Sequence, residues 1–430
     1  MIKVKTATTN CVVICFTICG TSELVLLSCQ MQLQSIAYFP SWAIYSSNFN
    51  VWDINPEGLT HLSYAFANIV DGEVVLGDLW ADIQKANIDH EDSTELYSKD
   101  MLHGNLLQLF LLKSKYRWIK TGISVGGWSW SANFSDVAAT EESRRKFAAS
   151  AIKFALDYGM DFVDLDWEFP VQGGLEGNVH RPEDAYNFVL LLKELKEQFA
   201  QHPDHPLALF IATGAFLNEK IYNYVEMDKY VDRYNMMCYD FTGSWSQLVD
   251  HHSNLEARDT EHHSAKKAIQ FAINQGADPQ KIIMGVPLYG RGFAETKGLL
   301  ESFSGVGEGT YGEPGYYPYR GLPVQGSSEH WDAQIGAPYC YDNEKKLLIS
   351  YDNYKSVENK LNWIIEMGLG GVMLWELSGD PSYDSSCSIQ KIIHRTIGNR
   401  MDKTPNNMAY PNSPYKNIRD CGQAKCCRRQ

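Results

Sequence analysis

The chain has 430 residues, a formal net charge of −14 and a pI near 5.3. This acidic balance argues against nucleic acid as a partner, because phosphate binding requires clustered lysine and arginine. The length does not require two domains, since a barrel of strand–helix units commonly exceeds roughly 250 residues as one domain.

The first 33 residues are predicted to be an N-terminal leader or extension. Lys3 and Lys5 precede an apolar run at 11–19, in the order found in secretory signal peptides. Glu23 interrupts the apolar sequence, and the run is too short to span a membrane. We therefore expect a secreted protein, with a cytoplasmic location as the alternative.

Cysteine usage is uneven along the chain. Of the ten cysteines, four lie before residue 30 and three after residue 420. The fold is therefore not expected to depend on disulfides, and no cysteine pair has partners at zinc-ligand spacing. No metal or cofactor is expected.

Apolar runs alternate with amphipathic runs from residue 34 to residue 398. The runs rich in β-branched and aromatic residues predict strands at 34–39, 61–68, 121–125, 162–168, 208–213, 234–239, 282–288 and 371–377. Apolar residues at helical spacing predict helices at 102–116, 141–158, 183–199, 264–275 and 355–367. This alternation predicts an α/β fold, a TIM (β/α)8 barrel of parallel strands.

One long segment, 293–351, separates the seventh predicted strand from the following helix. It contains short β-like stretches at 337–341 and 346–349, and such a length within a compact unit implies its own substructure. The predicted barrel comprises 34–292 and 352–398, the segment 293–351 is an insertion, and 399–430 is an irregular C-terminal tail.

The most informative run is MDFVDLDWEFP at 160–170, which carries Asp161, Asp164, Asp166 and Glu168. On a strand the last three acids share one face at intervals of roughly 7 Å. They cannot all ionise normally in a partly dry site, so we interpret them as catalytic, with Glu168 kept protonated. The alternatives are an acidic edge strand or an open metal site. Asp161 has the opposite parity and is predicted to be a structural tie.

This run has the form D-x-x-D-x-D-x-E. Together with SVGG at 124–127, MCYD at 237–240, GVPLYGR at 285–291 and GGVMLW at 370–375, it resembles glycoside hydrolase family 18. The detail is most similar to single-domain chitinases of filamentous fungi. Three positions depart from the family pattern: Phe162 stands where Gly is usual, Phe169 where Tyr is usual, and His252 where Gln is usual.

The resemblance implies a glycoside hydrolase that cleaves β-1,4 linkages between N-acetylglucosamine units of chitin and chito-oligosaccharides, with retention. Glu168 would act as acid and then base, and Asp166 would orient the 2-acetamido group of the substrate. Asp164 would share a proton with Asp166, and Tyr239 would donate to the acetamido oxygen, which is the nucleophile. A chitin-binding lectin without activity and an endo-β-N-acetylglucosaminidase on N-glycans remain alternatives.

The resemblance also implies that 293–351 is a small α+β insertion domain. This domain would form one wall of a deep cleft, with Trp375 as the floor. The full set of matched substrate-binding positions is Tyr38, Trp128, Met237, Asp240, Trp245, Tyr289, Arg291 and Trp375. For Trp42 and Trp130, packing is an equally good interpretation. His251, His252, His262 and His263 are expected to form a solvated turn rather than a metal site. The expected partners are chitin and its oligomers, with no nucleic acid or membrane, and the protein is expected to be a monomer.

Overall fold

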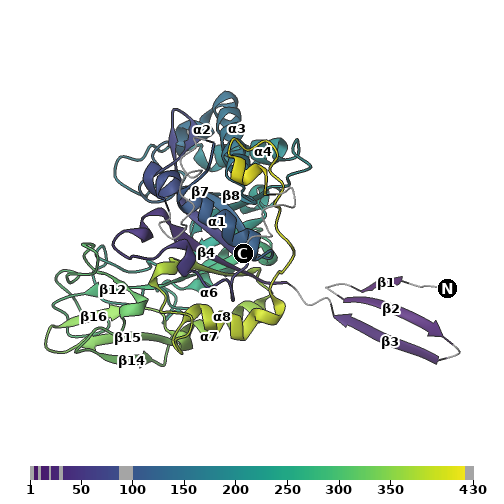
Figure 1. Ribbon diagram of the computed structural model, residues 1–430. Helices are drawn as coiled ribbons and strands as arrows, with labels where there is room; N and C mark the ends of the chain where they lie inside the picture. Colours follow the sequence, from purple (N-terminus) through teal and green to yellow (C-terminus); the bar gives the residue numbers. More distant parts are fainter. Residues whose placement is uncertain (1–3, 8–10, 19–20, 29–31, 87–99, 422–430) are drawn as a thin grey trace.

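The computed structural model describes residues 4–7, 11–18, 21–28, 32–86 and 100–421 (Figure 1). At its centre lies a closed ring of parallel strands, in which each strand pairs with the next and β17 pairs with β4. The strands are β4 (Gln34–Pro40), β5 (His61–Val70), β7 (Lys120–Gly126), β8 (Phe162–Asp166), β9 (Ala208–Gly214), β10 (Arg233–Met237), β11 (Ile282–Pro287) and β17 (Gly371–Trp375). The predicted TIM barrel is therefore confirmed.

Helices surround the barrel. They are α1 (Gly104–Lys115), α2 (Phe134–Ala139), α3 (Glu141–Asp157), α4 (Asp184–Phe199), α5 (Tyr224–Met227), α6 (Ala265–Asn274), α7 (Tyr354–Met367), α8 (Ile389–Ile397) and α9 (Lys416–Arg419). Local sequence explains their ends: the Thr140 side chain accepts the Ser143 amide at the start of α3, and Gly368 takes the left-handed conformation, with φ of 67°, after α7.

A second sheet interrupts the barrel between β11 and α7. Its antiparallel strands follow the order β13-β12-β16-β15-β14, and Figure 1 shows them on the opposite side of the barrel from α2, α3 and α4. They are β12 (Tyr289–Phe293), β13 (Tyr316–Pro318), β14 (Ser328–Asp332), β15 (Ala337–Asp342) and β16 (Leu347–Ser350). The sheet begins at Tyr289, inside the segment that the sequence assigned to the barrel.

The N-terminal segment contains β1 (Val4–Ala7), β2 (Cys11–Ile18) and β3 (Thr21–Ser28), which form an antiparallel sheet. Figure 1 shows this sheet apart from the barrel. Other parts of the predicted leader, including Lys3, lie outside the described residues, as do the cysteines after residue 421.

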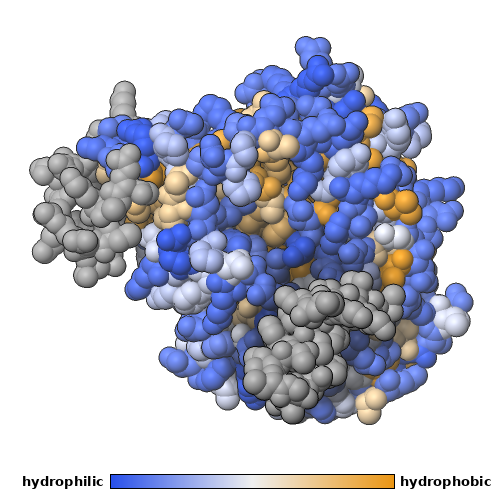
Figure 2. Space-filling view, turned by 90° about the vertical axis from the view of Figure 1, so that its right-hand side faces the viewer, coloured by the Kyte–Doolittle hydropathy of each residue, from blue (hydrophilic) through white to orange (hydrophobic). Residues whose placement is uncertain are grey.

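Hydrophilic residues predominate on the face drawn in Figure 2, and apolar residues gather there in small groups. Among the residues that the structure describes, no helix is both long and apolar enough to cross a lipid bilayer.

The barrel interior is filled by its own apolar group, which includes Ile36, Phe210 and Phe162. The ring of Phe162 stacks on Phe210 with 4.5 Å between centroids. A Cβ atom at Gly122 would lie 2.3 Å from the Phe162 ring, so the glycine leaves the space that this large side chain occupies. Phe162 thus closes the barrel below the acids, at the amino end of β8.

The C-terminal segment 401–421 is fastened to the amino end of the barrel. The Asn406 side chain donates to the carbonyls of Lys113 and Ile119, and Tyr410 donates to the carbonyl of Met160. Ile119 immediately precedes β7, and Met160 lies two residues before β8. The tail is irregular apart from short helices, but its polar side chains anchor it to the barrel.

Candidate active site

The acid run emerges at the carboxyl end of β8. The strand ends at Asp166, so the predicted strand to residue 168 was too long and Glu168 lies in the turn that follows. Trp167 packs away from the acids against Phe134, with 5.4 Å between ring centroids. The backbone amide of Glu168 donates to Ser131 Oγ at 2.9 Å, and its carbonyl accepts Asn178 Nδ2 at 3.0 Å. These contacts hold the turn in place.

Asp164 is fully buried and lies at the centre of a hydrogen-bond network from four other strands. Its Oδ2 accepts Tyr38 Oη and Ser124 Oγ, each at 2.7 Å. Longer contacts from Ser63 Oγ at 3.4 Å and Asn235 Nδ2 at 3.3 Å complete the set. Burial raises the pKa of Asp164 above its usual range even though these donors lower it.

The sequence did not identify Ser63 or Asn235 as supporting residues. The sequence carries no distinct signal for them, because β5 also contains His61 and Asn68 and β10 also contains Arg233. Tyr38 was expected to line the cleft, but it is 1% exposed and its hydroxyl serves Asp164.

Asp166 is buried, and its Oδ1 has no hydrogen-bond partner among the described residues. Burial raises the pKa of Asp166 well above its usual range, and the charges of Glu168 and Asp164 raise it further. A buried acceptor without a partner is rare, so this oxygen is available for a shared proton or a bound ligand.

Glu168 is half-buried beside a second carboxylate. Burial, followed by the charge of Asp240, raises the pKa of Glu168 to about 8. The carboxyl group therefore keeps its proton at neutral pH, which is the state that a general acid requires.

Asp240 is held in the opposite state. It follows β10 with a φ of 58° and accepts Tyr289 Oη at 2.7 Å and Arg291 Nε and Nη2 at 2.8 Å each. Burial alone would raise the pKa of Asp240, but His252 and Arg291 hold it below its usual range. Two neighbouring carboxyl groups with pKa values pushed apart are typical of an acid–base site.

Tyr239 lies beside this pair, in the loop just after β10. Burial and the charge of Asp166 raise the pKa of Tyr239 well above its usual range, so the phenol keeps its proton. Within the part of the chain that the structure describes, its hydroxyl meets a weak acceptor alone, Met373 Sδ at 4.0 Å. The hydroxyl can therefore donate to a ligand.

Aromatic side chains surround the acids. Trp375 at the end of β17 stacks on Phe66 with 5.6 Å between centroids and meets Tyr38 edge-on at 5.4 Å. The ring centroids of Trp42 and Trp375 lie 6.4 Å apart, and Trp42 is 46% exposed. Packing alone therefore does not account for the position of Trp42. Trp375 is half-buried, leaving part of its surface for a ligand.

Three further lining positions lie around this centre. Trp128 and Trp245 are 50% and 60% exposed, and the Arg291 guanidinium lies 5.7 Å from the Trp245 ring centroid. Met237 is half-buried and packs against the apolar group of the barrel interior.

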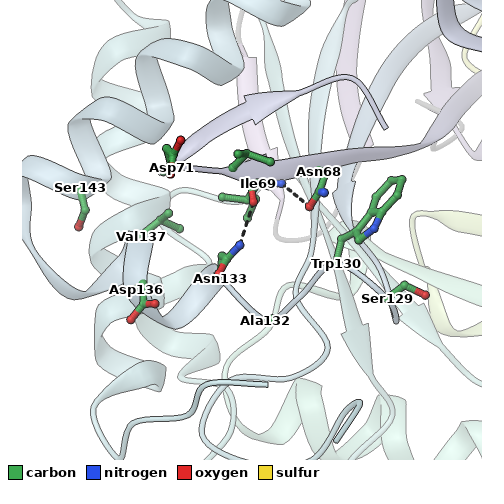
Figure 3. Close-up of a pocket in the computed structure, with 12 residues that line it drawn as sticks. Asn68, Ile69, Asp71, Ser129, Trp130, Ala132, Asn133, Asp136, Val137 and Ser143 are labelled. Atoms are coloured by element: carbon green, nitrogen blue, oxygen red, sulfur yellow. Dashed lines mark hydrogen bonds between the residues drawn. The ribbon is translucent and has the colours of Figure 1, made fainter. Parts of the chain in front are cut away.

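Trp130 packs against the apolar group of the barrel interior and also lines a cavity of about 580 Å³ near the carboxyl end of β5 (Figure 3). Asn133 Nδ2 donates to the carbonyl of Ile69 at 2.9 Å across this cavity, and the side chain of Asn68 accepts the Ile69 amide. None of the acids after β8 lines this cavity. It is therefore distinct from the acid cluster.

The expected solvated turn of histidines was wrong for two residues. His251 and His252 are 2% and 0% exposed, because the loop that carries them packs beneath the second sheet, where the His252 amide donates to Ser350 Oγ. His262 and His263 are half-buried. Within the described ranges, no group of three or more His, Cys, Asp or Glu residues is arranged to hold a metal ion.

Comparison with known proteins adds an independent observation. The family described as "Glycosyl hydrolases family 18" matches residues 34–380. "Chitinase 1" of Aphanocladium album is 36% identical over 396 residues, covering 89% of each protein.

Solved structures are also similar. Chitinase ChiA74 from Bacillus thuringiensis has a TM-score of 0.81 and 31% identity, covering 88% of this chain and 71% of that chain. A mutant of catalytic domain 2 of the Ostrinia furnacalis Group II chitinase, solved with penta-N-acetylchitooctaose, has a TM-score of 0.74 and 25% identity, with 87% and 99% covered.

Proposed function

The chain belongs to the glycosyl hydrolases of family 18, and from this membership we propose that the acid cluster after β8 cleaves chitin with Glu168 as general acid and base. The protein is a chitinase that hydrolyses the β-1,4 linkages of chitin and its oligosaccharides. The lectin and N-glycan alternatives are not favoured, since the relatives and structural neighbours described above are chitinases.

The observation that carries the proposed mechanism is the cluster of acids at the carboxyl end of β8, in which Asp166 Oδ1 is buried without a partner among the described residues. The raised pKa of Glu168 and the lowered pKa of Asp240 support it. In the first step Glu168 gives its proton to the glycosidic oxygen as the bond from that oxygen to the anomeric carbon breaks. The acetamido oxygen of the same sugar attacks the anomeric carbon, which forms a cyclic oxazolinium ion. In the second step ionised Glu168 takes a proton from water, which opens this ring with overall retention.

The remaining acids assist the nucleophile. Asp166, with its unpartnered Oδ1, accepts the N–H of the acetamido group and offsets the positive charge that develops there. The raised pKa values of Asp164 and Asp166 support one proton shared between them. Tyr239 donates its hydroxyl to the acetamido oxygen and orients it toward the anomeric carbon.

The lining residues bind the sugar chain. Trp375 stacks under the cleaved sugar, and the exposed indoles of Trp128 and Trp245 extend this stacking surface to either side. The β12–β16 sheet supplies Tyr289 and Arg291 through β12, and it forms one wall of the cleft.

The first test is Glu168→Gln, which keeps the volume of the side chain and removes the transferable proton. We expect turnover on chito-oligosaccharides to fall by about 10²–10⁴-fold while oligomer binding, measured by calorimetry, is largely retained. Asp161→Asn is the matched control, because this acid on the same run contacts Lys113 instead of the cluster. Turnover like that of the wild type in Glu168→Gln would refute the assignment.

The enzyme is proposed to act outside the cell as a monomer, with the cytoplasm as the alternative location. An insoluble polymer does not enter cells, which supports secretion. Activity in culture medium and lysate, compared for the full chain and a chain lacking 1–33, distinguishes the locations, and size-exclusion chromatography gives the oligomeric state.

A further inference from the structure

His252 lies at the back of the active site, in the loop between β10 and α6. Its side chain is fully buried, and its Nδ1 lies 3.6 Å from Asp240 Oδ1. The imidazole packs on Tyr289 with 5.3 Å between ring centroids. Asp240 is thus contacted by Tyr289 and Arg291 of β12 and lies close to His252.

The groups around His252 favour a neutral ring. Burial lowers the pKa of His252 below its usual range; Asp240 opposes this effect, and the positive charge of Arg291 adds to it. Asp352, the other facing acid, is already engaged by Lys360 and by Ser253 Oγ. A neutral imidazole carries one N–H, and Nδ1 is the ring nitrogen that lies 3.6 Å from Asp240 Oδ1.

Neither ring nitrogen of His252 has a hydrogen-bond partner among the described residues. A distance of 3.6 Å is longer than a hydrogen bond, so the ring acts on Asp240 through its N–H dipole and by blocking movement of the carboxylate. The backbone amide of His252 donates to Ser350 Oγ of β16 at 3.1 Å, which ties the imidazole to the second sheet.

We propose that His252 is a positioning residue that holds ionised Asp240 against Glu168 and thereby sets the upper pH limit of catalysis. This inference rests on the proposed role of Glu168 as the acid. The position departs from the Gln that is usual in the family.

His252 acts on Glu168 indirectly, through the charge of Asp240. After burial, the charge of Asp240 is the cause that raises the pKa of Glu168. If His252 is lost, Asp240 is held less firmly near Glu168, and the pKa of Glu168 falls. Arg291 and Tyr289 still hold Asp240, so the effect is partial.

The test is the pH profile of kcat/KM for His252→Leu and His252→Gln. In His252→Leu the alkaline limb moves to lower pH, and a limb that lies one pH unit lower reduces activity at alkaline pH by about tenfold. The acid limb and KM at the optimum change little. His252→Gln keeps an N–H donor of similar reach and restores the profile of the wild type.

His251→Leu is the matched control. His251 is also buried, but its Nε2 faces Asp332 Oδ2 of β14 at 3.6 Å instead of Asp240. This variant lowers the melting temperature and leaves the alkaline limb in place. If His252→Leu does not fold, His252→Asn replaces it. The shorter amide of asparagine cannot reach Asp240, so the alkaline limb should again move to lower pH.

This inference is overturned if the alkaline limb is unchanged in both the Leu and the Asn variants of His252. It is also overturned if His251→Leu moves the limb equally. Failure of the proposed function is separate, because it shows as retained turnover in Glu168→Gln. A dead Glu168→Gln with an unchanged limb in the His252 variants rejects the role of His252 alone.

Discussion

Glu168 and Asp240 are two carboxyl groups that share one site in opposite protonation states. Of these two residues, only Glu168 lies in the run at 160–170, where the alternation of the sequence identified it as the proton donor. The state of Asp240 depends on Arg291 and His252, which are distant in sequence. Sequence alternation therefore predicts which acids face a site, whereas the pKa of each acid is set by tertiary neighbours.

The raised pKa of Glu168 makes a prediction about stability. Its pKa is about 8 in the folded protein and ordinary in the unfolded chain, so the unfolded chain binds fewer protons between roughly pH 4.5 and 8. Stability contributed by the neutral carboxyl is present below this window and is lost as pH rises through it. The side chain in Glu168→Gln does not titrate. The melting temperature of this variant, relative to that of the wild type, should therefore rise from pH 5 to pH 8. A difference in melting temperature that stays constant across this pH range would contradict the raised pKa of Glu168.

Asp166 gives a second prediction at this scale. Asp166→Asn removes the charge that the acetamido group needs and the proton shared with Asp164, so kcat should fall by about 10²-fold or more. The pH profile should also change shape, because the coupled pair no longer titrates together. Kinetics on a chito-oligosaccharide across pH measures both effects. A profile of normal shape and rate would mean that Asp166 does not assist the nucleophile.

At the scale of elements, the starts of strands were predicted better than their ends. β8, β10 and β17 all end before the predicted boundary, at Asp166, Met237 and Trp375. After β8 and β10 the chain leaves the ladder just before Glu168 and Tyr239, whereas Trp375 is itself the last residue of β17. The buried state of His252 was missed for a related reason, because the polar loop gave no sign of the sheet that covers it.

The second sheet makes the element-scale prediction. Phe293 of β12 pairs with Leu348 of β16, so a two-residue turn in place of 295–346 retains the hairpin that carries Tyr289 and Arg291. The shortened enzyme should bind long oligomers more weakly through lost wall contacts, and hydrolysis of short substrates should suffer less. Kinetics on the dimer and hexamer series tests this, after circular dichroism has established folding. Equal losses on both substrates would count against the sheet as a wall.

At the scale of the whole molecule, the C-terminal tail fastens the end of the barrel opposite the acids. Tyr410 of the tail joins, through its hydroxyl, a buried ion pair between Lys113 and Asp161 of the barrel, which lie 2.6 Å apart. Parity predicted a structural role for Asp161, and the structure places it in this pair. The partners from the tail could not be predicted, since the tail has no periodicity.

Tyr410→Phe tests this arrangement. Tyr410 is 2% exposed, and its hydroxyl accepts from Lys113 Nζ at 3.0 Å and donates to the Met160 carbonyl at 3.0 Å. Lys113 keeps Asp161 and the Gly159 carbonyl as partners, whereas the Met160 carbonyl loses this donor. The loss should cost about 1–3 kcal/mol of unfolding free energy, measured by denaturant titration. Turnover at 25 °C should stay unchanged, because the contact lies at the amino end of the barrel. A loss of turnover without a loss of stability would place the tail in the catalytic machinery instead.

The central claim is that the acetamido group of the substrate is the nucleophile. The most direct measurement is a proton NMR time course of early product from a chitin oligomer and from its fully deacetylated counterpart. We expect the β-anomer from the acetylated oligomer, since two inversions occur. We expect no turnover of the deacetylated oligomer. Predominant α-anomer, or comparable rates on both oligomers, would contradict this claim and move Asp164 or Asp166 into a direct role.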